Sequence, residues 1–116
     1  MYSRYVYGIE AEQIALNHLK FLGYVMLFQR YKTSHGEIDL IVLKDEQLLF
    51  VEVKARKKQI SLHNIISNKQ LLRNYAAAEI FLSKFIEYAH YSCRFDLIIV
   101  IKNEISAHIK NLIYDC

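Results

Sequence analysis

The sequence has only three glycines, two cysteines and no proline among its 116 residues. Because the glycines are scattered singly, no glycine-rich loop is present to cradle a phosphate. Cys93 and Cys116 are too few and too isolated to form a disulfide framework, so we expect two reduced thiols. The five histidines and two cysteines show no zinc-binding spacing, and no G-x-S-x-G nucleophile elbow occurs.

Long apolar runs are also absent. The longest, Phe21–Phe28, is eight residues, whereas a membrane span needs about 18. The N-terminal part carries Glu10, Glu12 and Gln13 where a secretory signal requires an apolar core. We therefore predict a cytoplasmic protein that makes no membrane contact.

The composition indicates one folded domain over residues 1–116, because 53% of the residues are hydrophobic. The net charge of +3 is mild, but its distribution is informative. Lys54, Arg56, Lys57 and Lys58 lie within five residues, directly after an acidic segment. Such a run is suited to holding phosphates. The alternative is a solvated strand end or loop.

Hydrophobic periodicity predicts an α/β fold. We expect a central mixed sheet of about five strands with a helix packed on each face. Residues 60–66 are compatible with either a short edge strand or the lead-in to a helix. The expected helices cover residues 9–22 and 68 to about 90, and the expected strands cover 24–28 (extending toward 31), 38–43, 48–53, 94–102 and 105–109.

The two central strands form a hairpin with acidic residues at its open end. A tight turn at Asp45-Glu46 pairs residues whose numbers sum to 91, so Asp39 lies opposite Glu52 and Glu37 opposite Lys54. Since side chains alternate between the faces of a strand, all four are expected on one face. Directly opposed Cβ atoms are roughly 4.5–5.5 Å apart.

Two carboxylates at that separation must share a proton or hold a cation. Oxygen ligands of this kind suit Mg²⁺ or Mn²⁺, so we predict a metal site at Asp39 and Glu52, assisted by the Val53 carbonyl. The Lys54 ammonium is placed to steer a water or a phosphate oxygen. The alternative is a hairpin end whose charges fan into solvent.

Other charged residues are candidates for the same site. Glu12 lies on the flank of the first predicted helix, facing the seam between helix and sheet, where it would reach the metal; a plain helix-flank charge is the alternative. Arg30 and Lys32 lie in a polar link that would face a phosphate backbone. Lys69 and Arg73 lie near a helix N-terminus, which favours anions, although a solvent-facing pair is equally compatible with the pattern.

The hairpin resembles the PD-(D/E)xK nuclease superfamily, and more narrowly the small bacterial YraN-like proteins, which are similar to archaeal Holliday junction resolvases. The proline for which the superfamily motif is named is often absent from its members, and here Ile38 precedes Asp39. The resemblance implies a restriction-endonuclease-like core, a first-helix glutamate, Glu12, in the active site, and DNA as the substrate. The segments that carry it are Gly36-Glu37-Ile38-Asp39-Leu40, Phe50-Val51-Glu52-Val53-Lys54-x-Arg56, Glu12-x-x-Ala15, Gly23-Tyr24, Lys69-Gln70 and Arg94-Phe95-Asp96.

Taken together, these features predict a magnesium-dependent endonuclease-like protein that hydrolyses phosphodiester bonds in branched or structured DNA. Arg56, Lys57, Lys58 and Lys69 would hold the flanking backbone. Resolvases act as dimers, so the resemblance also implies a possible homodimer. The alternative is a nucleic-acid-binding or partner-binding module that keeps the fold without cutting, and a third interpretation is a structural domain that binds no divalent metal.

Overall fold

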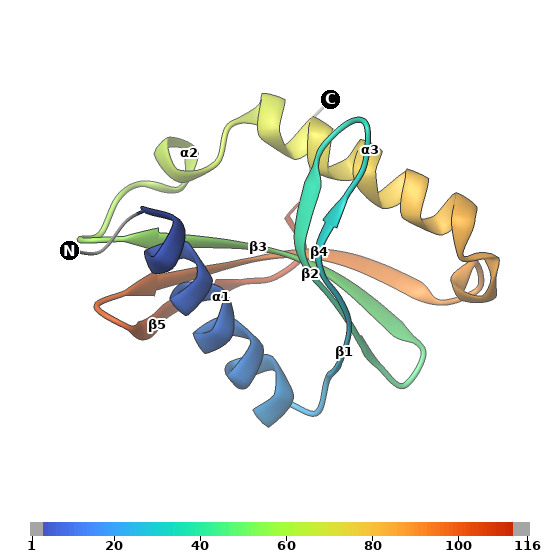
Figure 1. Cartoon of the computed structure of the whole chain (residues 1–116), viewed down its shortest axis with the longest axis horizontal. Coiled ribbons are helices and arrows are strands. Elements are labelled where there is room, and N and C mark those ends of the chain that lie inside the picture. The colour runs from blue at the N-terminus through green and yellow to red at the C-terminus, as the bar shows by residue number, and fades with distance from the viewer. Residues whose placement is uncertain (1–3, 113–116) are drawn as a thin grey trace.

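The computed structural model describes residues 4–112, and in them five strands form one mixed sheet with helices on both faces (Figure 1). This confirms the predicted α/β architecture. The elements, in chain order, are α1 (Arg4–Phe21), β1 (Val25–Lys32), β2 (Glu37–Lys44), β3 (Gln47–Arg56), α2 (Leu62–Ile65), α3 (Asn68–Lys84), the 3-10 helix η1 (Ile86–Tyr88), β4 (Ser92–Ile101) and β5 (Glu104–Ile109).

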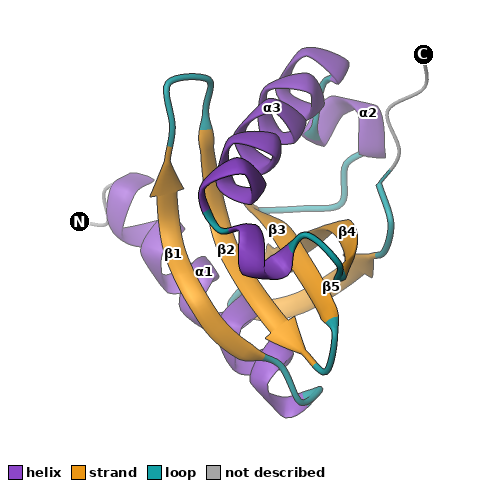
Figure 2. Cartoon of the chain, turned by 90° about the vertical axis from the view of Figure 1, so that its right-hand side faces the viewer, coloured by secondary structure: helices purple, strands orange, loops and turns teal. Residues whose placement is uncertain are grey.

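The strands lie in the order β1-β2-β3-β4-β5. In the described chain β3 and β4 are parallel, whereas the other neighbouring strands are antiparallel. The crossover from β3 to β4 contains α2 and α3, as a parallel pair requires. This crossover places α3 against one face of the sheet, while α1 covers the other (Figure 2). The half-exposed strand predicted at 105–109 is the edge strand β5.

Helix α1 begins at Arg4, five residues before the predicted start, and ends close to the predicted boundary. Gly23 follows it with φ of 101°, a conformation that suits glycine. The N–H of Gly23 bonds to the Lys20 carbonyl at 2.9 Å, and that of Tyr24 to the Leu19 carbonyl at 3.0 Å. These bonds satisfy the last carbonyls of α1 and turn the chain into β1.

Two apolar layers hold the sheet between the helices. Against α1 the core is aliphatic, and against α3 it is largely aromatic. Phe81 of α3 is fully buried and stacks on Phe85 with ring centroids 4.6 Å apart. Edge-to-face contacts join it to Tyr31 and Phe50 at 5.2 and 5.8 Å. Burying rings of this size is among the larger favourable contributions to folding, so α3 is fixed firmly above β1, β2 and β3.

The segment around α3 differs in part from the prediction. Ser67 is its N-cap, and its hydroxyl accepts a hydrogen bond from the Gln70 N–H at 3.1 Å. The ambiguous segment 60–66 contains the short helix α2, not a strand. Helix α3 ends at Lys84 instead of near residue 90, because Phe85 leaves the helical conformation at φ −115° and ψ 72°.

Two further expectations concern the cysteines and membrane-spanning helices. Cys93 is a free thiol in the structure, while Cys116 lies outside the described residues. Among residues 4–112, no helix has the length and apolarity to cross a membrane.

Candidate functional site

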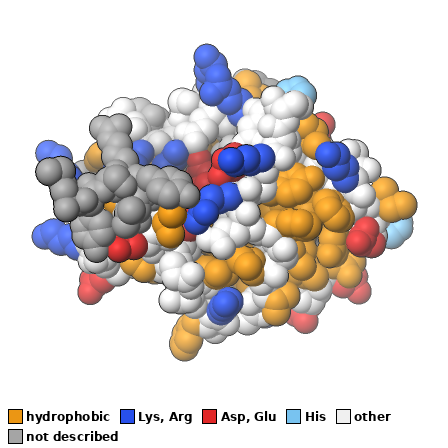
Figure 3. Space-filling view, viewed as in Figure 1, with side chains coloured by type: hydrophobic (Ala, Val, Ile, Leu, Met, Phe, Trp, Pro, Cys, Tyr) orange, Lys and Arg blue, Asp and Glu red, His pale blue; other side chains and the backbone are white. Residues whose placement is uncertain are grey.

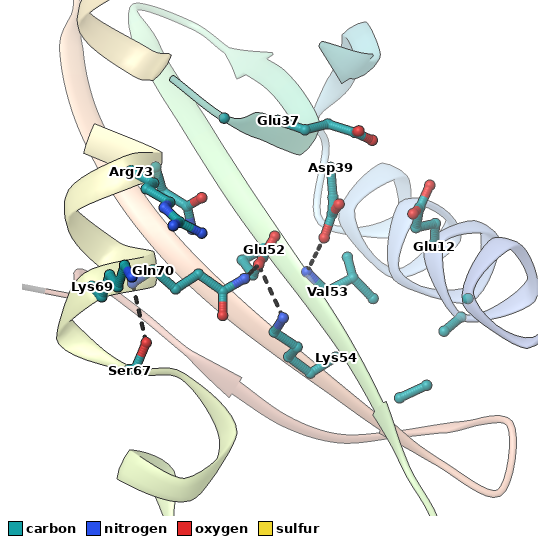
Figure 4. Close-up of a pocket in the computed structure, with 15 residues that line it drawn as sticks. Glu12, Glu37, Asp39, Glu52, Val53, Lys54, Ser67, Lys69, Gln70 and Arg73 are labelled. Carbon is teal, nitrogen blue, oxygen red and sulfur yellow. Dashed lines mark hydrogen bonds and ion pairs between the residues drawn. The ribbon is translucent and has the colours of Figure 1, made fainter. Parts of the chain in front are cut away.

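A cavity of about 570 Å³ opens where the β2–β3 hairpin meets α1 and α3. We call it the acidic pocket, because Glu12, Glu37, Asp39 and Glu52 line it. The labelled acids come from α1, β2 and β3, while Gln70 and Arg73 extend from α3 on the opposite side (Figure 4). On the molecular surface, acidic side chains lie at the centre of one face with lysine and arginine beside them (Figure 3).

The hairpin has the predicted register. Its pairs run from Lys44↔Gln47 to Leu40↔Val51, so partner numbers sum to 91. The paired ladder ends there, one residue before the acids. Asp39 uses its Oδ2 atom to accept a hydrogen bond from the Val53 backbone N–H at 2.8 Å. The prediction that Asp39 and Glu52 form a directly opposed pair is therefore corrected: they lie beyond the ladder, at the point where the hairpin opens into the pocket.

The side chain of Asp39 does not follow the regular alternation of strand β2. Ile38 packs with Ile41 in the cluster beneath α3, although residues three apart in a regular strand point to opposite faces. Arg30, with φ of 51°, lies between the pairs Gln29↔Leu40 and Tyr31↔Ile38, so its place in the register is opposite Asp39. This local distortion interrupts the alternation at Asp39. The side chain of Asp39 consequently lies between Glu12 and the Val53 backbone (Figure 4).

Burial and mutual repulsion change the acidity of this group. Burial, followed by the hydrogen bond and charge of Glu52, raises the pKa of Asp39 to about 8, although the Val53 N–H and the Lys54 charge oppose the rise. Burial and then the negative charge of Asp39 also raise the pKa of Glu12, against the opposing effect of Arg30. Burial and the closeness of the acids therefore disfavour the ionised forms of Asp39 and Glu12.

Neighbouring side chains already engage two of the acids. Glu52 is only 4% exposed, and its Oε2 atom lies 3.2 Å from the Lys54 Nζ. The amide Nε2 of Gln70 also donates to Glu52 Oε2. Glu12 Oε1 accepts a hydrogen bond from Arg30 Nε at 2.9 Å. Arg30, predicted to contact nucleic acid, is thus an ion-pair partner of Glu12 in this structure.

The other predicted phosphate contacts lie in two places. Lys54, Lys69 and Arg73 line the acidic pocket. Lys57 and Lys58 are exposed and line a second cavity beside the β4–β5 turn.

Two more predicted contacts lie outside both cavities. Lys32 is exposed at the end of β1. The Arg56 guanidinium donates to the Ala55 carbonyl at 2.8 Å. The structure therefore gathers part of the predicted basic set around the acids and leaves the remainder apart from them.

Sequence reasoning missed Gln70 and Asn74 as residues of the site. Both line the acidic pocket, and Gln70 bonds directly to Glu52. The available signal was the N-cap at Ser67, which fixes where α3 begins. Residues four apart on a helix share a face, so Lys69 and Arg73 form one pair and Gln70 and Asn74 form the adjacent one.

A second polar cluster lies away from the pocket. His18 Nε2 is 3.0 Å from His108 Nδ1, and His108 Nε2 is 2.7 Å from Asp96 Oδ2. Burial alone would raise the pKa of Asp96, but hydrogen bonds from His108, Arg94 and the Asn111 backbone bring it below its ordinary value. These contacts join His18 of α1 to His108 of β5 and Asp96 of β4, and they give the buried Asp96 a structural role.

The donor set of the acidic pocket is suited to a hard divalent cation in its charge and atom types. Asp39 and Glu52 offer carboxylate oxygens that repel each other when both are ionised, a conflict that a cation would relieve. Within residues 4–112, however, no three His, Cys, Asp or Glu side chains are arranged as a metal-binding group. In this arrangement the two hairpin acids are the central ligand candidates, and Glu12 would have to leave Arg30 to join them.

Comparisons with a family model and with individual proteins both give the same family. Residues 11–100 match the model of the uncharacterised protein family UPF0102. A UPF0102 protein of Mesorhizobium japonicum is 36% identical over 92% of this chain and 86% of its own length. A UPF0102 protein of Rhodopseudomonas palustris is 39% identical over 88% of this chain and 78% of its own length. A UPF0102 protein of Bartonella tribocorum is 40% identical over 81% of this chain and 72% of its own length.

Proposed function

The chain belongs to the uncharacterised protein family UPF0102, and from this premise and its buried acid pair we propose that it is a metal-dependent endonuclease-like protein. Its substrate would be branched or otherwise structured DNA, and its reaction the hydrolysis of a phosphodiester bond. The observation that carries the proposal is that the carboxyl groups of Asp39 and Glu52 interact in a pocket that also contains the Lys54 ammonium. A cytoplasmic location and a homodimeric state belong to the same proposal.

In this proposal Asp39 and Glu52 hold Mg²⁺ or Mn²⁺, assisted by the Val53 carbonyl and by Glu12. When bound, such an ion supplies a water of lowered pKa and offsets charge that develops on the phosphate. The raised pKa of Asp39 supports this assignment, because a carboxyl that resists ionisation beside Glu52 ionises more readily once a cation is present. Binding of the metal should therefore release protons near neutral pH.

Lys54 has the role of orienting the attacking water. Its Nζ lies 3.2 Å from Glu52 Oε2, and its side chain is about one-fifth exposed. A partly buried ammonium has few orientations available, so it can donate a hydrogen bond in a fixed direction. Gln70, which donates to the same carboxylate oxygen, would fix the rotamer of Glu52.

Basic side chains around the pocket would bind the phosphates on either side of the scissile bond. Lys69 and Arg73 line the pocket itself. The exposed Lys57 and Lys58 would extend the contact toward the β4–β5 turn, and Arg56, Lys32 and Arg30 would contribute nearer the sheet. Phosphate contacts of this kind give binding that weakens steeply as salt rises.

The test is cleavage of a panel of four-way junction, flap, single-stranded and linear duplex DNA in Mg²⁺. We expect wild type to cut a branched substrate, and Glu52→Gln and Lys54→Met to lose at least about a hundredfold in rate, as removal of a key charged group does. Glu46→Gln, in the exposed β2–β3 turn, is the matched control and should cut like wild type. Equal rates for wild type and Glu52→Gln would refute the nuclease.

A non-cleaving module is the second candidate function, favoured by the contacts that already engage the acids. Arg30 and Gln70 bond to Glu12 and Glu52, and the described residues contain no three-residue metal group. Calorimetry with Mn²⁺ separates the two functions. Heat that is lost in Asp39→Ala supports the metal site, whereas equal heats for both proteins, together with binding of junction DNA, would establish the non-cleaving module.

A further inference from the structure

Asn74 has a buried amide without a hydrogen-bond partner. Its side chain lies on the sheet-facing side of α3 among Leu71, Ala77 and Phe81, and the residue is only 3% exposed. Within the described residues, its Nδ2 atom has no hydrogen-bond partner. Buried donors are paired in the great majority of cases, because an unpaired one loses its hydration without replacement. The unpaired donor therefore needs an explanation.

The position of Asn74 provides one, since the residue lines the acidic pocket. Lys69 and Arg73 line the same wall from the first two turns of α3. The helix has no acidic residue in its first turn, and Ser67, its N-cap, also lines the pocket. The first turn of a helix carries partial positive charge from its unpaired N–H groups. Two cations, a helix N-terminus and a free amide donor therefore belong to one wall, which we call the α3 wall.

The opposite wall has the reverse character. Asp39 and Glu52 repel a bare anion there, and the proposed function assigns that side to a cation and the scissile phosphate. An anion bound at the α3 wall is therefore a different group of the ligand from the scissile phosphate. In nucleic acid that group is a neighbouring backbone phosphate, whose oxygens accept hydrogen bonds from amides, ammonium groups and guanidinium groups alike.

The turn between β1 and β2 closes this wall on one side. A Cβ atom added at Gly36 would lie 3.3 Å from the Arg73 carbonyl oxygen and 3.5 Å from its Cβ. The absence of a side chain therefore lets the turn approach α3 closely at Arg73. This contact holds the base of the Arg73 side chain beside the pocket.

We propose that Asn74, with Lys69 and Arg73, binds a backbone phosphate next to the one that is cut. The inference rests on the proposed function for the identity of the strand, but binding at the α3 wall requires neither a metal nor cleavage. Asn74 thus acts as a contact that positions the strand, and its unpaired donor is satisfied only in the complex. Removing the donor should then stabilise the free protein and weaken its complex with DNA.

The experiment measures these two effects together in EDTA. Fluorescence anisotropy with a labelled single strand and a labelled four-way junction gives DNA affinity, and urea unfolding gives stability. For Asn74→Leu we expect a higher unfolding midpoint and roughly tenfold weaker DNA binding, as the loss of one hydrogen bond to a charged oxygen predicts. Asn17→Leu, at an exposed position of α1, is the control and should leave DNA affinity unchanged.

A second variant keeps the inference testable in case Asn74→Leu does not fold. Asn74→Asp keeps the shape of the side chain but brings a negative charge to the anion, so it should weaken binding more than Asn74→Leu does. Wild-type affinity in both variants would overturn the inference, as would failure of the wild type to bind DNA in EDTA. Calorimetry with inorganic phosphate separates the possible sources: we expect much weaker binding than for a strand, and equal affinity would assign the wall to a small phosphate instead.

These outcomes are distinct from a failure of the nuclease. DNA binding that depends on Asn74, in a protein that cuts nothing in Mg²⁺, would retain the α3 wall and reject the catalytic proposal. Cleavage that is lost in Glu52→Gln but unchanged in Asn74→Leu, with equal DNA affinity, would reject the α3 wall and retain the nuclease.

Discussion

Replacing Asp39 by asparagine should stabilise the protein at high pH. The pKa of Asp39 in the folded chain is raised to about 8, chiefly by burial and then by Glu52, from an ordinary value of 3.8. Between these two values the folded chain holds a proton that the unfolded chain has lost. Stability therefore falls as pH rises across this window, because the folded state binds more protons. Above pH 8 the folded protein must accommodate two neighbouring carboxylates.

The size of the effect follows from the shift. Each pKa unit corresponds to about 1.4 kcal/mol, so the rise sets a ceiling of roughly 6 kcal/mol on the destabilisation at high pH. Since water and the Lys54 ammonium can reach the ionised pair, we expect about 2–4 kcal/mol. An asparagine keeps an acceptor for the Val53 N–H, and its amide can donate to Glu52. The variant should thus lose the repulsion without losing the hydrogen bond.

The assay is urea unfolding at pH 5 and pH 9 in EDTA. We expect Asp39→Asn to resemble wild type at pH 5 and to exceed it by about 2–4 kcal/mol at pH 9. Glu46→Gln, exposed in the β2–β3 turn, should follow wild type at both values. Mn²⁺ should close most of this gap, because a ligand at about 100 times its Kd adds about 2.7 kcal/mol to wild type alone. Equal pH dependence in wild type and Asp39→Asn would refute the reasoning.

Three further predictions concern the supporting structure. Phe81→Ala should destabilise the fold by about 3–5 kcal/mol, since Phe81 is fully buried at the centre of the aromatic layer; a loss below 1 kcal/mol in urea unfolding would show that α3 is held elsewhere. Gly36→Val should move the β1–β2 turn away from Arg73, because the Arg73 carbonyl oxygen would lie 3.3 Å from the new Cβ. In fluorescence anisotropy this variant should bind DNA more weakly than the control Ser34→Val, which changes an exposed neighbour. Burial, then His108 and Lys110, lowers the pKa of His18. The stability that neutral His18 contributes is therefore present above the unfolded pKa of about 6.5 and is lost as pH falls through that value. His18→Gln should flatten the pH dependence of unfolding between pH 7.5 and 5, and an unchanged slope would contradict the assignment.

Much of the hairpin could be predicted because its determinants are local. The apolar runs around Asp45-Glu46 admit one register that keeps a consistent face, and the observed pairs have that register. The ends of the helices at Gly23 and Ser67 are local in the same way, since each residue acts on its own helix terminus. The order of elements then left few topologies for a mixed sheet.

The details of the site depend on contacts between distant segments. Nothing near Arg30 in the sequence indicates a left-handed residue in β1, yet that residue lies opposite Asp39 and interrupts its strand. The bond from Gln70 to Glu52 joins positions 18 apart. The end of α3 at Lys84 was also missed, because a helical pattern continues through residues that form a separate 3-10 turn. Local periodicity carries no information about such pairings.

The two polar clusters in the protein differ in a way that bears on function. The Asp96 cluster is satisfied internally: its carboxylate accepts bonds from Arg94, His108 and the Asn111 backbone, and its pKa is lowered. The acidic pocket instead combines a raised pKa at Asp39 with an unpaired donor at Asn74. Departures from local rules are expected where a protein binds or reacts. Under the proposed function, a bound cation would relieve the conflict at Asp39, whereas Asp96 needs no ligand because protein groups already satisfy it.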